Sequence, residues 1–237
     1  MNRMTFWDHI DELRHRIFKS IFVLVLSSIF SYSYSNQIIS ILLSPLETID
    51  MLNNIQVLSI TTFFLTKVLV SIISGILFSL PFIMYQIWVF VQPLFTIKKS
   101  NSFMLLTFSL LFSLFGFLFA YFVIIPNSLY FFTSISNNDI AINYNFTLDG
   151  YISYVCWILL GCCLLFQLPI VTIFGCFIGL FTTEFLKQYR RLGLVLFMVV
   201  SAVITPPDPV SQLFVFFPLA ILYEFSILIS RMIKKKW

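Results

Sequence analysis

The sequence predicts an all-α polytopic membrane protein with six transmembrane helices and both termini on the cytoplasmic side. Of its residues 59% are hydrophobic and only 10% are charged, whereas an average soluble domain has about 25% charged residues. Thirteen of the fourteen Lys and Arg residues fall into four clusters, separated by gaps that can each hold two membrane crossings. These clusters are residues 3–19, 98–99, 187–191 and 231–236.

Six apolar stretches approach the roughly 20 residues that a helix needs to cross about 30 Å of hydrocarbon. They are approximately 17–34, 68–91, 103–125, 152–180, 192–204 and 210–229. The fifth stretch reaches only about 20 Å at 1.5 Å per residue, so short fifth and sixth helices predict a locally thinned membrane beside them. We expect residues 1–237 to form one transmembrane domain.

Basic residues that flank spans stay on the cytoplasmic side, which orients the predicted bundle. The two long segments on the other side, 35–66 and 126–151, carry acids, and Lys67 is their basic neighbour. The net charge of +4 is therefore read as topology signals and contacts with anionic lipids, and we expect no nucleic-acid partner.

Residues 1–16 predict an amphipathic helix that lies in the cytoplasmic interface and runs into the first span. Thr5 and Asp8 form a capping-box pattern at its start. One face is apolar: Phe6, Ile10, Leu13 and Ile17. The opposite face is polar: Asp8, Asp11, Glu12, His15 and Lys19.

Prolines at 81, 126, 169 and 218 predict bends in the spans, because each removes a backbone donor. Residues 205–209 contain three prolines and predict a rigid, nonhelical hairpin between the last two helices. Gly175 and Gly179 form a GxxxG pair that could let another helix approach closely.

Polar residues inside spans are costly, so each has either a pairing or a functional role. Gln167, Gln212 and Glu224 are the candidates, and helix-to-helix hydrogen bonding and ligand binding both remain open for them. The four cysteines lie in the fourth span and are expected to be packing residues. His9 and His15 have no third ligand nearby, so we expect no metal. No nucleophile and base, phosphate loop or carboxylate pair is recognisable, so we predict neither an enzyme nor a cofactor.

A series of motifs resembles the TatC family, the six-span integral subunit of the twin-arginine (Sec-independent) protein translocase. The resemblance runs from about residue 5 to residue 231, in the family's order and spacing. The motifs are FWDHIDELRHR at 6–16, SPL at 44–46, YQIWVFVQPL at 85–94, AYF at 120–122, FQLP at 166–169 and TPPDPVSQ at 205–212.

The resemblance implies a receptor that binds signal peptides bearing paired arginines and helps folded proteins cross the membrane, driven by the proton-motive force. It places signal-peptide binding at the N-terminal segment and at the loop after the second span. The residues implied are His9, Asp11, Glu12, Arg14, Phe90, Pro93 and Lys99. A fixed carboxylate such as Glu12 suits the fork of a guanidinium, and Phe90 would pack against the residue after the arginine pair.

Two positions depart from the family's pattern. Lys99 stands where the family usually has a second glutamate, so the site would lean on Glu12 with Asp8 or Asp11, bind more weakly or read an altered signal; Lys98 and Lys99 could instead contact lipid. Gln167 stands where many relatives carry glutamate, which weakens a proton-relay role there.

The resemblance also implies partners: single-span Tat subunits (TatA- or TatB-like) that dock on the fifth and sixth spans, and oligomers containing several copies. The residues implied for this surface are Thr205, Pro206, Asp208, Gln212 and Tyr223. We expect a bacterial inner membrane, with the mitochondrial inner membrane as the alternative. A small secondary transporter or a membrane assembly scaffold is the rival function; the transporter would predict an inverted repeat or paired broken helices, which we do not find.

Overall fold

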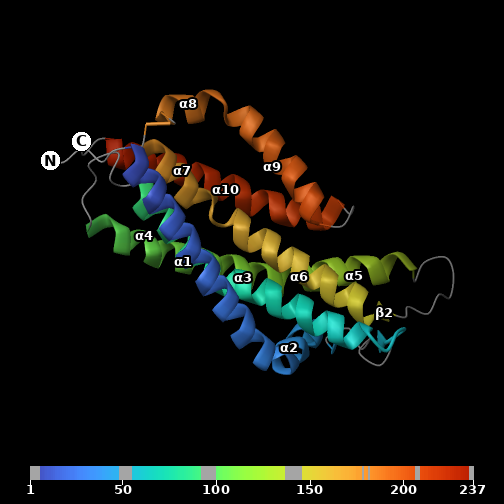
Figure 1. The fold of residues 1–237 in the computed structure, drawn as a ribbon. Coiled ribbons are helices and arrows are strands. Elements are labelled where there is room, and N and C mark those ends of the chain that lie inside the picture. The colour runs from blue at the N-terminus through green and yellow to red at the C-terminus, as the bar shows by residue number, and fades with distance from the viewer. Residues whose placement is uncertain are drawn as a thin grey trace.

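The computed structural model describes residues 6–47, 55–91, 100–136, 146–177, 179–180, 182–205 and 209–234. Its helices form an elongated bundle (Figure 1), which confirms the all-α polytopic fold class. The helices are α1 Phe6–Ser33, α2 Ser35–Glu47, α3 Thr62–Val91, α4 Ser100–Phe119, the π-helix η3 Ala120–Ile124, α5 Ile125–Ser136, α6 Leu148–Leu165, α7 Leu168–Phe177, α8 Thr183–Gln188, α9 Arg190–Ile204 and α10 Pro209–Lys234. The strands are β1 Ile55–Gln56 and β2 Phe146–Thr147.

Five stretches of the described residues are long and apolar enough to cross a membrane. They are His9–Ser33, Thr62–Val91, Leu105–Ser134, Leu148–Cys176 and Ser211–Leu228. The 15 residues of α9 reach only about 22 Å at 1.5 Å per residue, so this helix is short, as expected. The expectation of a short last helix is wrong for α10 as a whole, which has 26 residues, because its basic C-terminal turns continue the helix beyond the apolar stretch.

The N-terminal segment runs directly into the first span, and its place in the membrane interface stays a prediction. The single helix α1 contains both that segment and the first span. Between Phe6 and Ser33 the sequence holds neither Gly nor Pro, so nothing in the backbone interrupts helical propagation. Thr5, the predicted cap, lies outside the described residues.

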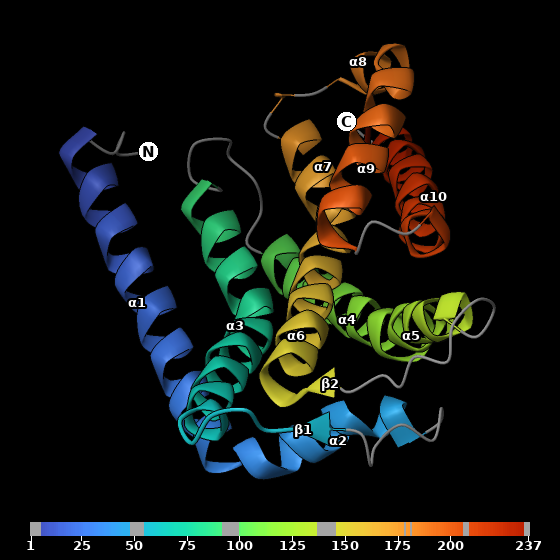
Figure 2. The same cartoon turned by 90° about the vertical axis from the view of Figure 1, so that its right-hand side faces the viewer.

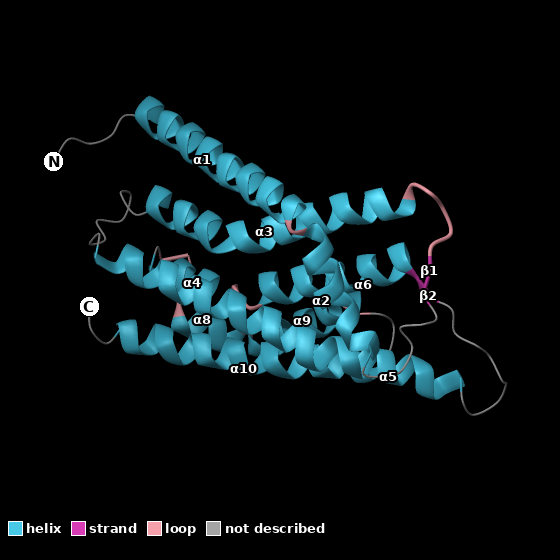
Figure 3. Ribbon diagram, turned by 90° about the horizontal axis from the view of Figure 1, so that it is seen from below, coloured by secondary structure: helices cyan, strands magenta, loops and turns pink. Residues whose placement is uncertain are grey.

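The two ends of the bundle differ in charge. Helices α1 and α4 begin and α10 ends at one end, whereas α3 and α6 begin beside the two strands at the opposite end (Figure 3). The first half of α1 carries Arg14, Arg16 and Lys19, and the last turn of α10 carries Lys234. We call this the basic end, and the end that contains α2 and the strands the far end.

Pro81 and Pro218 lie inside the uninterrupted helices α3 and α10, whereas the helices are irregular near Pro126 and Pro169. The third span contains η3 and continues through α5 past its predicted end at residue 125, and the Ile125 N–H bonds to the Ala120 oxygen just before Pro126. The wider π turn accommodates the proline without ending the helix. In the fourth span, Phe166 and Gln167 interrupt the helix, and Pro169 lies in the first turn of α7, where its missing N–H is harmless.

The far end is closed by elements that the sequence analysis did not predict. Helix α2 lies across the spans (Figure 2), and β1 pairs in parallel with β2, Ile55 opposite Phe146. Strands of two residues are too short to show an alternating pattern. Two tyrosines fix α2 to the bundle: Tyr121 Oη donates to the Ile41 oxygen at 2.7 Å, and Tyr151 Oη donates to the Leu42 oxygen at 3.0 Å.

The glycine at which two helices approach closely is not one of the predicted pair, Gly175 and Gly179. Gly179 lies beyond the end of α7 with φ +74°, so the expected GxxxG face is wrong, because the second glycine terminates the helix rather than lining it. The close helix approach occurs instead at Gly75 of α3, where the Ser27 hydroxyl of α1 donates to the Gly75 oxygen at 2.9 Å.

Candidate functional site

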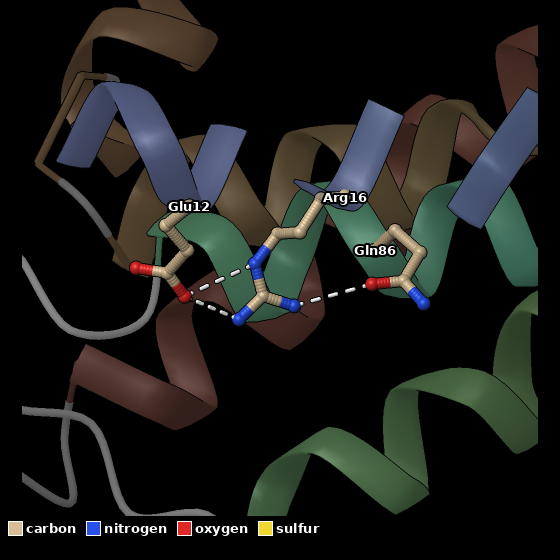
Figure 4. Close-up of polar contacts among 3 residues, drawn as sticks. All are labelled: Glu12, Arg16 and Gln86. Carbon is tan, nitrogen blue, oxygen red and sulfur yellow. Dashed lines mark hydrogen bonds and ion pairs between the residues drawn. The ribbon is translucent and has the colours of Figure 1, made fainter. Parts of the chain in front are cut away.

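Three polar side chains join α1 to α3 near the basic end (Figure 4). Arg16 Nε donates to Glu12 Oε1 at 3.1 Å, and Arg16 Nη2 bonds to the same oxygen. Arg16 Nη1 donates across to Gln86 Oε1 at 3.2 Å. Glu12 and Arg16 are one helical turn apart, and their side chains are only 20% and 19% exposed. The ion pair is thus partly shielded and anchored to a second helix.

Two polar atoms beside this ion pair lack a partner among the described residues. Glu12 Oε2 and His9 Nδ1 are both buried without a hydrogen bond, and positions 9 and 12 share one face of α1. The His9 ring stacks on Phe90 of α3, with ring centroids 4.3 Å apart. A buried carboxylate oxygen without a donor is costly. The cluster of His9, Glu12 and Phe90 is therefore suited to receive a cationic donor.

Of the remaining residues predicted for this site, only the side chains of Asp11 and Arg14 are among those that the structure describes. Asp11 and Arg14 are exposed, and the Arg14 guanidinium lies over the Phe18 ring of its own helix at 5.8 Å. Pro93 and Lys99 lie outside the described residues. The side chain of Asp8 is likewise outside the description.

The sequence placed Arg16 in the N-terminal segment of the predicted surface without naming it as a site residue, and Gln86 was missed. The spacing of Glu12 and Arg16 is the one at which helical ion pairs form, so Arg16 could have been inferred from it. Gln86 lies 70 positions from Arg16. Its part in the site depends on how α1 and α3 pack, and no local pattern reveals it.

The predicted partner surface lies on α9 and α10, and its described members bond within the chain. Thr205 Oγ1 donates to the Ser201 oxygen at 2.8 Å, and Tyr223 Oη donates to the Leu186 oxygen at 2.8 Å. Gln212 Nε2 donates to the Met198 oxygen at 3.1 Å. The Gln212 amide thus already has a partner on α9, which gives it a helix-to-helix hydrogen bond within the chain. Pro206 and Asp208 lie outside the described residues.

The other polar residues of the spans also pair between helices. Glu224 of α10 forms an ion pair with Arg190 of α9 near the basic end. Gln167, at the break of the fourth span, is fully buried. It accepts a hydrogen bond from Ser109 Oγ at 2.7 Å and donates to the Ser109 backbone oxygen at 3.1 Å. These contacts give both residues a structural role between helices.

Replacing Gln167 with leucine is expected to destabilise the bundle by about 1–3 kcal/mol, because it removes two interhelical hydrogen bonds in an apolar setting. Thermal unfolding of the purified protein in mild detergent measures the change. Gln167→Glu is the matched variant, since a protonated carboxyl keeps one donor and one acceptor and should lose less. A leucine variant as stable as the parent would show that this pair does not hold α4 to the fourth span.

The fold and this site together define a polytopic helical membrane protein with a shielded carboxylate at its basic end. The family model "Sec-independent protein translocase protein (TatC)" matches residues 8–218. The chain is 33% identical to a protein named TatC from Carboxydothermus hydrogenoformans, over 98% of this chain and 95% of that protein. It is 31% identical to TatCy of Bacillus subtilis, over 100% of this chain and 92% of that protein.

Solved structures agree with the sequence relatives. A crystal structure titled Twin Arginine Translocase Receptor TatC, in DDM, has a TM-score of 0.83 and 29% identity, covering 94% of this chain and 99% of that one. A second structure of that receptor has a TM-score of 0.79 and covers 98% of its own chain. The chain belongs to the TatC family of Sec-independent protein translocase subunits. It is a multi-pass membrane transport protein and not an enzyme.

Proposed function

We propose that this chain receives twin-arginine signal peptides at the His9, Glu12 and Phe90 cluster and so admits folded proteins to translocation. Glu12 Oε2 carries the proposal, because it is a buried anionic acceptor that has no donor among the residues that the structure describes. A guanidinium bonded there can also donate to the unpaired nitrogen of His9 in its neutral form. Phe90, already stacked on His9, offers an aromatic face to a cation or to the apolar residue that follows the arginine pair.

The proposed topology has six spans in one domain, with both termini and the basic end in the cytoplasm. The charge difference between the two ends supports it through the positive-inside rule. The named relatives are bacterial proteins, and a bacterial inner membrane is the compartment we propose. In that setting the proton-motive force drives transport and no nucleotide is needed.

Single-span Tat subunits are the proposed membrane partners, docked on α9 and α10 in an oligomer that contains several copies. The support is an exposed apolar face of α9 at helical spacing: Leu192, Val195, Val199 and Val203. Because α9 is shorter than the bilayer is thick, the membrane beside it would thin, which favours short partner helices gathering there.

Lys99 makes this receptor depend on Glu12 more than its relatives depend on that position. With a cation where the loop glutamate is usual, Glu12 supplies the negative charge for the arginine pair. We expect weaker binding than in relatives that have both acids, because one charge-assisted hydrogen-bonding group is missing.

Site-specific photo-crosslinking from position 90 tests the receptor function. Membranes containing the full chain are mixed with a signal peptide that carries its arginine pair or paired lysines. Crosslinks should form with the arginine peptide and fall sharply with the lysine peptide, because lysine lacks the planar fork. A probe at Tyr130, exposed on α5 at the far end, is the control. If both peptides crosslink equally at position 90, or if neither peptide crosslinks there, the proposal is wrong.

A further inference from the structure

We infer that Arg16 and Gln86 are positioning residues that hold one oxygen of Glu12 and present the other to an incoming arginine. The inference rests on the proposed function and adds to it a reason why one carboxylate can serve as a selective receptor. It assigns a role to Gln86 of α3, a residue that does not itself need to touch the signal peptide.

Arg16 approaches Glu12 through a single carboxylate oxygen. Both Nε and Nη2 of Arg16 bond to the same oxygen, Oε1, so the guanidinium leaves Oε2 unused. A fork that used both oxygens would have engaged Oε2 as well. The observed arrangement stabilises the charge of Glu12 and keeps a complete acceptor available for another guanidinium.

Gln86 of α3 anchors the Arg16 side chain. Arg16 is a long side chain with several rotatable bonds, and a pair within one helix would not fix its position. Its third bonding group, Nη1, is held by Gln86 Oε1, and Gln86 is only 7% exposed. The glutamine therefore ties Arg16, and through it Glu12, to the packed interface between α1 and α3.

A fixed Glu12 carboxylate is expected to prefer arginine over lysine. A receptor group that is already ordered loses less entropy when its ligand binds, and holding it within narrow geometric limits favours a ligand whose donors match. A mobile Glu12 would attract any cation, whereas a fixed Oε2 beside His9 favours the planar donors of arginine over the rotating ammonium of lysine. Fixing Glu12 should thus raise both affinity and the preference for arginine.

The test compares Gln86→Leu, Gln86→Glu and Arg16→Lys in the full chain, reconstituted in nanodiscs. Affinity is measured by titrating a fluorescent signal peptide that carries paired arginines or paired lysines. Gln86→Leu should weaken binding of the arginine peptide by about three- to tenfold and lower the ratio of arginine to lysine affinity. Gln86→Glu keeps an acceptor for Arg16 and should restore both values, while Arg16→Lys cannot bridge both partners and should lose as much as the leucine variant.

Gln37→Leu, the same replacement at an exposed position on α2 at the far end, controls for the substitution itself. Thermal unfolding of each variant separates loss of binding from loss of fold. If Gln86→Leu does not fold, the affinities of Arg16→Lys for the two peptides test the inference instead. If the parent chain prefers arginine and neither Gln86→Leu nor Arg16→Lys reduces that preference, this inference is wrong while the receptor function stands. A parent chain that binds both peptides equally overturns the receptor function, and this inference with it.

Discussion

Glu12→Gln is expected to weaken binding of a twin-arginine signal peptide by about ten- to a hundredfold, the range for losing a hydrogen bond to a charged group. The replacement keeps the shape of the side chain and removes the charge, so Oε2 no longer exists as an anionic acceptor. Residues 92–99, which follow α3, contain no Asp or Glu, so this segment has no carboxylate of its own to compensate. Export of a reporter protein that depends on a twin-arginine signal should fall to background.

Asp11→Asn provides the matched control for that experiment. Asp11 neighbours Glu12 and loses the same charge when changed, but its side chain is exposed, so its attraction for a signal arginine is screened by water and salt. Its effect should stay within about twofold. Equal losses in the two variants would show that only the general charge of α1 matters. Normal export by Glu12→Gln would place recognition elsewhere on the chain.

The helical part of the fold could be predicted because a membrane restricts the possible solutions. Within lipid every backbone polar group must be satisfied internally, so a long apolar stretch is almost always a helix. That reasoning predicted long apolar helices, of which the described residues contain five that could span a membrane, and an irregularity near Pro169. It could not anticipate α2 or the pairing of Ile55 with Phe146, because outside the spans several arrangements satisfy the backbone and tertiary contacts select among them.

The candidate site likewise contains some residues that the sequence predicted and others that only tertiary packing reveals. His9, Glu12 and Phe90 were predicted through the resemblance to a family, and the structure brings these three together. Asp11 and Arg14 were predicted with them because they share the same short motif, but neighbours in a helix point in different directions. Gln86 was missed because its contact with Arg16 depends on the register between α1 and α3, which a sequence without coordinates does not specify.

Gly75 of α3 lies close to Ser28 of α1, and Gly75→Ala is expected to destabilise the protein by about 2 kcal/mol or more, as overpacking of a tight interface does. A methyl group at this position would lie 2.1 Å from Ser28 Oγ and 2.8 Å from both the Ser28 Cα and backbone N. Rotation of the Ser28 side chain can relieve only the first of these contacts. The backbones of α1 and α3 must therefore move apart at Gly75. Because α1 packs mainly against α3, this separation weakens the main contact of α1 with the bundle.

Gly193→Ala is the matched control, because the same methyl group on α9 would lie an ordinary 3.5 Å from the Tyr223 ring. Both changes replace glycine inside a helix, which alone favours alanine by about 1 kcal/mol, so the two variants should shift the unfolding temperature in opposite directions. Gly75 and Gln86 are separated by about 16 Å along α3. A displaced α1 would therefore also stretch the hydrogen bond from Arg16 to Gln86. Gly75→Ala should therefore lose affinity for the arginine peptide together with stability, whereas equal stability of the two variants would mean that α1 and α3 do not meet closely at Gly75.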